Sequence, residues 1–129
     1  MDVQEVLALY DREQRREIQF PGMEREETPG IVRYVRPLPG MSFVLYSDLD
    51  DATADAAIGE QLAYFGARGL KFEWKVYGHD RPADLVARLV ARGFEAEPRD
   101  DIMVLDVANA PAALLAETAA DVRRLTDPA

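Results

Sequence analysis

The feature that most constrains the fold is a strand–helix–strand pattern in residues 41–77. Residues 41–46 form a mainly apolar run, and residues 70–77 alternate between apolar and polar side chains, as expected of a half-buried strand. Between them, residues 47–53 are rich in side chains that cap helices, and the glycines before residue 70 are expected to end the helix. Because a helical crossover joins parallel strands, this pattern predicts one parallel pair.

The segments around this unit predict further strands and helices. The segment 19–30 predicts a loop, because it contains two Pro-Gly pairs and an acidic run. We therefore expect an α/β (α+β) fold: a mixed, mostly antiparallel sheet with one parallel strand pair and helices on both faces. The other expected elements are a helix over 2–18, a strand over 31–36 that pairs with 41–46 as a hairpin, a helix from Pro82 to Gly93, and short strands over 94–97 and 102–107.

Composition excludes several kinds of site. The chain has 129 residues, no cysteine and one histidine, which excludes disulfides, thiolate zinc sites, cysteine nucleophiles and multi-histidine metal sites. With 24 acidic and 15 basic residues the net charge is -9, so nucleic acid and anionic membranes are not expected partners. The acidic N-terminus lacks the pattern of a signal peptide, and no apolar stretch reaches the roughly 20 residues of a membrane span. A cytoplasmic protein is the expectation.

One stretch of the chain resembles a known family. Residues 72–82, with the sequence FEWKVYGHDRP, are followed by the Gly93-Phe94 pair and the expected strand at 102–107. This order resembles the second half of the GNAT superfamily, the acyl-CoA-dependent N-acyltransferases. The Glu-Trp-Lys-x-Tyr part is similar to the N-terminal half of bacterial proteins with two GNAT-type domains in tandem. The resemblance covers most of residues 1–107 and is specific in residues 72–94.

The resemblance implies an activity and partners for the whole protein. A GNAT-type protein transfers an acyl group from acetyl-CoA to an amine, here of a small molecule or a peptide. A tandem member implies a C-terminal GNAT domain as partner; a homo-oligomer is the alternative. Residues 1–107 are then the GNAT-like domain, and residues 108–129 a linker with the opening strand of a second domain, since 121–128 suggests a strand followed by a helix cap. A frayed terminus is the alternative reading of this tail.

The cofactor turn of the family is not found in this sequence. In the family, acyl-CoA binding rests on an Arg/Gln-x-x-Gly-x-Gly/Ala turn, because a pyrophosphate needs free backbone N–H groups and the positive end of a helix. The corresponding residues 46–60 contain one glycine, five acidic side chains and no Arg or Lys. Leu89 stands where many active members place a tyrosine as general acid, and we interpret it as a core residue. These departures favour a non-catalytic domain with a structural or substrate-shaping role, in which binding of acetyl-CoA by this chain is not expected.

We assign no catalytic, cofactor-binding or metal-binding residue, and single out five side chains as candidates. Glu73 and His79 could act as bases, although charge pairing for Glu73 and a capping or surface role for His79 are the ordinary alternatives. Tyr34, Tyr46 and Tyr77 could line a substrate pocket, or they could lie at amphipathic edges of the core.

Two other functions stay open. A complete small acetyltransferase with an atypical cofactor turn predicts strands that splay near Tyr46 and Tyr77, with free backbone groups facing a groove. An unrelated α/β interaction module predicts no splayed strands and a large apolar patch on one face of the sheet.

Overall fold

A computed structural model describes residues 1–126. Contacts divide the chain into a first unit, residues 1–98, and a second unit that begins at Arg99. The first unit contains helix α1 (Val3–Tyr10), the π-helix η1 (Asp11–Arg16), strands β1 (Glu24–Thr28), β2 (Ile31–Val35) and β3 (Ser42–Ser47), helix α2 (Ala54–Ala67), strand β4 (Phe72–Trp74) and helix α3 (Leu85–Ala91).

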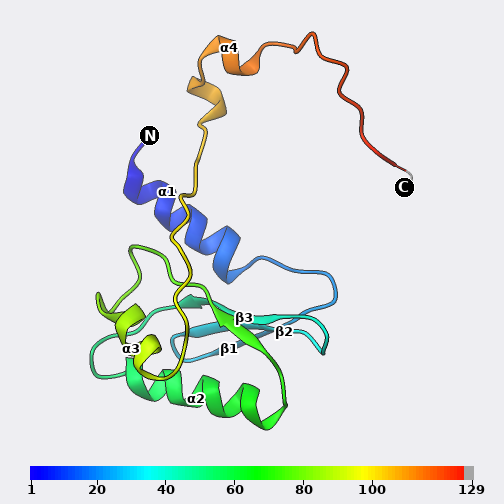
Figure 1. Cartoon of the computed structure of the whole chain (residues 1–129). Coiled ribbons are helices and arrows are strands. Elements are labelled where there is room, and N and C mark those ends of the chain that lie inside the picture. The colour runs from blue at the N-terminus through cyan, green and yellow to red at the C-terminus, as the bar shows by residue number, and fades with distance from the viewer. Residues whose placement is uncertain (127–129) are drawn as a thin grey trace. The chain divides into compact units, whose positions relative to one another are not determined.

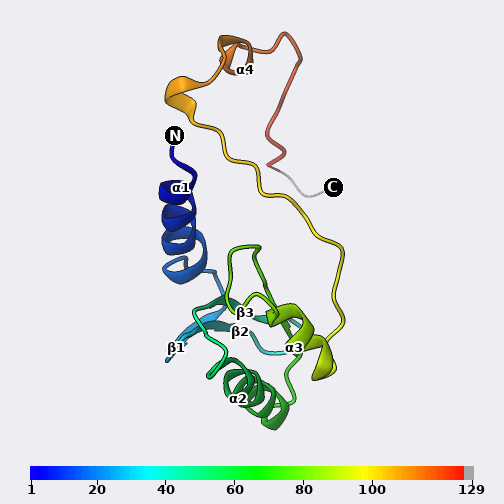
Figure 2. The same ribbon diagram turned by 90° about the vertical axis from the view of Figure 1, so that its left-hand side faces the viewer.

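The strands of the first unit form one mixed sheet in the order β1-β2-β3-β4 (Figure 1). The β1–β2 and β2–β3 pairs are antiparallel, whereas β3 and β4 are parallel and are joined by α2. The predicted α/β fold and its single parallel pair are therefore confirmed. Helix α1 lies on one side of the sheet, and α2 and α3 lie on the other, as Figures 1 and 2 both show.

Each face of the sheet has its own core, because neighbouring residues of β3 point to opposite faces. Val44 belongs to the larger core, which lies under α2 and α3 and contains Phe65 and Leu85. Leu45 belongs to the smaller core on the other face, with Val32 and Tyr34. The first unit thus buries apolar side chains on both sides of a sheet of four strands.

The ends of the helices follow from local chemistry. Asp2 caps α1, accepting a hydrogen bond from the Gln4 N–H at 2.9 Å. The predicted helix over 2–18 is found as α1 followed by η1. After α2, Gly69 has a φ of +63°, a left-handed conformation that glycine adopts without steric cost and that ends helices.

The predicted loop over 19–30 is wrong in its second half, which contains β1. The sequence analysis missed this strand because EREET is entirely polar and has no apolar alternation. Such a sequence suits β1, because β1 is an edge strand and pairs with one neighbour, β2. Arg33 on β2 donates to Glu26 on β1, so the charges stabilise the pair. Gly30, with φ +74°, makes the turn between the strands, and a Cβ there would lie 2.8 Å from the Asp48 carbonyl oxygen.

Four further strand predictions are wrong or too long. The strand predicted over 70–77 is only Phe72–Trp74, and residues 94–97 form no strand. Residues 102–107, in the second unit, do not form a strand. The helices and strands found in the described part of that unit are the 3₁₀ helix η2 (Val107–Asn109) and the helix α4 (Ala112–Leu115). Residues 121–126 form no strand, and the rest of the predicted 121–128 segment lies outside the described residues. An apolar run shows that a segment suits a strand, but a strand also needs a neighbour that supplies hydrogen bonds.

Among the described residues, no helix is long and apolar enough to cross a membrane.

Candidate functional site

The pairing of β3 with β4 ends near the middle of β3. Their pairing ends where the Lys75 N–H donates to the Val44 carbonyl at 2.9 Å. The next carbonyl of β3, Leu45, accepts instead from Nε of Arg15 at 3.0 Å. β4 ends at Trp74, so Tyr46 and Tyr77 are not paired with each other, and Arg15 binds the first carbonyl of β3 beyond the paired residues.

Arg15 is the centre of a buried polar cluster, and its side chain is 0% exposed. Its two terminal nitrogens donate to the two carboxylate oxygens of Asp80, at 2.9 and 2.7 Å. The Nη1 atom also donates to Asp11 at 2.7 Å. Burial alone lowers the pKa of the guanidinium, but the hydrogen bonds and charges of Asp80 and Asp11 outweigh it and raise the pKa above its usual value.

Aromatic rings close this cluster. The Cζ atom of Arg15 lies 3.9 Å from the ring centroid of Tyr77 and 5.1 Å from that of Tyr46. His79 Nε2 lies 2.8 Å from Asp11, whose other oxygen binds Arg15. Burial, with a contribution from Tyr10 beside it, raises the pKa of Tyr77 to about 12. The structure therefore brings three of the candidate residues, His79, Tyr46 and Tyr77, together around one arginine.

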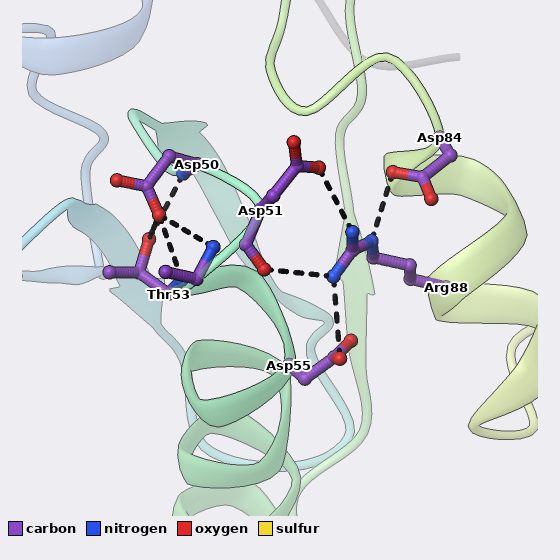
Figure 3. Close-up of polar contacts among 7 residues, drawn as sticks. Asp50, Asp51, Thr53, Asp55, Asp84 and Arg88 are labelled. Atoms are coloured by element: carbon purple, nitrogen blue, oxygen red, sulfur yellow. Dashed lines mark hydrogen bonds and ion pairs between the residues drawn. The ribbon is translucent and has the colours of Figure 1, made fainter.

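The loop between β3 and α2 is closed by its own carboxylate. Oδ1 of Asp50 accepts from the Ala52 N–H at 2.9 Å, the Thr53 N–H at 2.8 Å and the Thr53 hydroxyl at 2.9 Å (Figure 3). The hydroxyl oxygen of Thr53 in turn accepts from the Asp50 N–H at 3.0 Å. These hydrogen bonds, led by the hydroxyl of Thr53, lower the pKa of Asp50. The N–H groups that precede α2 are thus occupied by an anion that belongs to the chain itself.

Arg88 of α3 forms ion pairs with the same loop and with residues at the start of α2 and of α3. Its guanidinium lies 3.0 Å from Asp51, 3.3 Å from Asp55 and 2.9 Å from Asp84, as Figure 3 shows. The hydrogen bond with Asp84, together with the neighbouring carboxylates, raises the pKa of Arg88. The sequence analysis missed this residue, although the i,i+4 spacing of Asp84 and Arg88 is a recognisable signal.

The other candidates lie elsewhere. Glu73 forms an ion pair with Lys75 on an exposed part of the sheet. Tyr34 is fully buried, and its hydroxyl donates to the Ile18 carbonyl at 2.8 Å. Leu89 is a buried core residue, as predicted.

Of two hollows on the described surface, Tyr46 lines one, and Tyr34 and Tyr77 line neither. The larger has a volume of about 460 Å³ and is lined by residues that include Met23, Val35 and Leu70. The smaller, about 140 Å³, contains Tyr46. In the described part of the chain, no group of three or more acidic or histidine side chains is placed to hold a metal ion.

Arg15 is the residue that the sequence analysis missed in the main cluster. The signal that could have found it is its position, because Leu7, Asp11, Arg15 and Ile18 would share one face of the helix predicted over 2–18. A charged side chain on a face that otherwise meets the core needs a buried partner.

No protein-family model, no curated protein and no solved structure matches this chain.

Proposed function

We propose that this chain is a non-catalytic GNAT-like domain of an N-acetyltransferase, with a structural or substrate-shaping role. Acyl transfer from acetyl-CoA to an amine then takes place on a partner, either a C-terminal GNAT domain or another subunit. The proposal starts from the resemblance of residues 72–94, and two features of the first unit support it.

The observation that carries the proposal is the Asp50 carboxylate. A pyrophosphate at the start of α2 would use backbone N–H groups of the preceding loop, and Asp50 already occupies those of Ala52 and Thr53. A bound coenzyme has to displace this carboxylate and then lies beside it, together with Asp51 and Asp55. Like charges repel, so these exposed carboxylates oppose an anionic ligand, although solvent screens the repulsion.

Arg15 also supports the proposal, at the place where β3 and β4 stop pairing. A complete small acetyltransferase requires free backbone groups at this place. Here the Leu45 carbonyl is bound by a buried arginine. The geometry therefore favours a domain that keeps the family scaffold with both parts of a coenzyme site filled by its own side chains.

The experiment is a calorimetric titration of the full chain with acetyl-CoA, accompanied by a ³¹P NMR titration with pyrophosphate. We expect no binding of either by the unmodified chain. The Asp50→Gly variant frees the two N–H groups and should gain a measurable pyrophosphate shift. The matched control is Asp50→Asn, which changes the charge equally but keeps an amide oxygen that can cap the turn.

Micromolar binding of acetyl-CoA to the unmodified chain would disprove the proposal. Equal pyrophosphate shifts for Asp50→Gly and Asp50→Asn would show that net charge, and not occupation of the N–H groups, decides the outcome. Sedimentation of the unmodified chain then distinguishes a monomer that needs a separate catalytic domain from a homo-oligomer.

A further inference from the structure

We infer that Asp80, the Leu45 carbonyl and the rings of Tyr46 and Tyr77 form a binding site for a guanidinium group, and that Arg15 is its tethered ligand. We call these four residues the guanidinium cage. The inference is independent of coenzyme binding, since the cage and the Asp50 loop share no residue.

The backbone of the cage belongs to segments other than the one that carries Arg15, and the Tyr77 ring is also in contact with Tyr10 of that segment. Asp80 is held by its own turn: the Tyr77 N–H donates to its carboxylate at 3.0 Å, and the Asp80 N–H donates to the Tyr77 carbonyl at 3.0 Å. Leu45 and Tyr46 belong to β3, which is paired on one side with β2. All four residues therefore have positions that are set by the sheet and by the turn that follows β4.

The chemistry of the cage fits a guanidinium better than an ammonium. A planar fork can place two N–H groups on the two oxygens of one carboxylate, as Arg15 does on Asp80 at 2.9 and 2.7 Å. A third N–H donates to the Leu45 carbonyl, and the Cζ atom of the guanidinium lies 3.9 Å from the Tyr77 centroid. A lysine-like ammonium is a point charge and matches neither the fork nor the stacking.

The helix that delivers Arg15 has little other burial on the domain. No residue of α1 is buried, and Arg15 is the one buried residue of η1. Val3 and Leu9 are exposed. The N-terminal helix is thus held by a charged side chain in a polar site, as a peptide ligand is held by an anchor residue, and an arginine side chain from another chain has the chemistry to take its place.

The test uses the full chain with Arg15→Ala. This change removes Cγ, Cδ and the guanidinium, and ethylguanidinium supplies these same atoms. Ethylammonium is the matched control ligand, with the same charge but without the fork. The control protein is the double variant Arg15→Ala with Asp80→Asn, which lacks the cage carboxylate. Binding is followed by calorimetry and by the thermal unfolding midpoint in circular dichroism, at millimolar ligand.

We expect ethylguanidinium to raise the midpoint of Arg15→Ala saturably, because a ligand that binds only the folded state stabilises it. The same ligand should leave the unmodified chain and the double variant unchanged, and ethylammonium should act at least tenfold more weakly. If Arg15→Ala is unfolded without ligand, ethylguanidinium should restore its helical signal, so the titration remains decisive. No response of Arg15→Ala, an equal response to ethylammonium, or an equal response of the double variant would each overturn the inference.

Discussion

Replacing Asp80 by Asn should be the most damaging single change of charge in this protein. The Asp80 side chain is 3% exposed and Arg15 is 0% exposed, so the change leaves a buried guanidinium without its main partner. Breaking a buried ion pair in this way costs about 3–5 kcal/mol. Asp11 remains 2.7 Å from Arg15, which places the expected loss at the lower end, about 3 kcal/mol.

Urea unfolding followed by the fluorescence of Trp74, the single tryptophan, measures this loss. With a slope of about 1.5 kcal/mol per M, a loss of about 3 kcal/mol lowers the urea midpoint by about 2 M. Two comparison variants isolate the cause. Asp11→Asn removes the more exposed partner, 20% exposed, and should cost about 1 kcal/mol or less. Arg15→Met combined with Asp80→Asn removes the uncompensated charge and should be more stable than Asp80→Asn alone.

The reasoning fails if Asp80→Asn and Asp11→Asn cost the same, since the argument rests on the difference in burial between the two carboxylates. It also fails if the double variant is no more stable than Asp80→Asn, because the loss then does not come from a stranded buried charge.

Three other predictions concern separate parts of the first unit. Phe65 is fully buried and stacks on Phe72 at 4.2 Å, so Phe65→Ala should cost about 3–5 kcal/mol in urea unfolding, and more than Phe94→Ala, whose ring is only partly buried. The pKa of Asp50 is lowered from its ordinary 3.8, so the ionised carboxylate stabilises the fold above pH 3.8, and this stabilisation is lost as the pH falls through the folded-state pKa. The difference in free energy of unfolding between the unmodified chain and Asp50→Ala should therefore shrink over that acid range, as urea unfolding at a series of pH values can show. The pKa of Tyr77 is raised from 10.0 to about 12, so the neutral phenol stabilises the fold below pH 10.0, and this stabilisation is lost as the pH rises to about 12. In Tyr77→Phe the free energy of unfolding should fall less steeply over this range, as ultraviolet titration and alkaline unfolding together can show.

The elements that were predicted correctly are those whose signal is local. The crossover from β3 through α2 to β4 follows from an apolar run, a cluster of capping side chains and a second strand within residues 41–77. Leu89 was assigned to the core from helical spacing alone, and it is buried. The acidic character of the loop before α2 was also visible in the sequence.

The elements that were missed depend on a neighbour. Strand β1 carries five polar residues, and only pairing with β2 makes it a strand. Residues 94–97 and 102–107 have suitable strand sequences, but the described structure gives them no strand partner. Propensity for a strand is a property of a segment, whereas a strand is a property of a pair.

The candidate site divides in the same way. The sequence by itself determined the charge of the chain, the helix crossover and three of the side chains in the cluster: Tyr46, Tyr77 and His79. Only the tertiary structure decided that these side chains surround Arg15, since Asp80, its main partner, lies 65 positions further along the chain. The physical reason is that helical and strand periodicity report the local backbone, while the burial of a charge depends on which distant carboxylate the fold brings within hydrogen-bond distance.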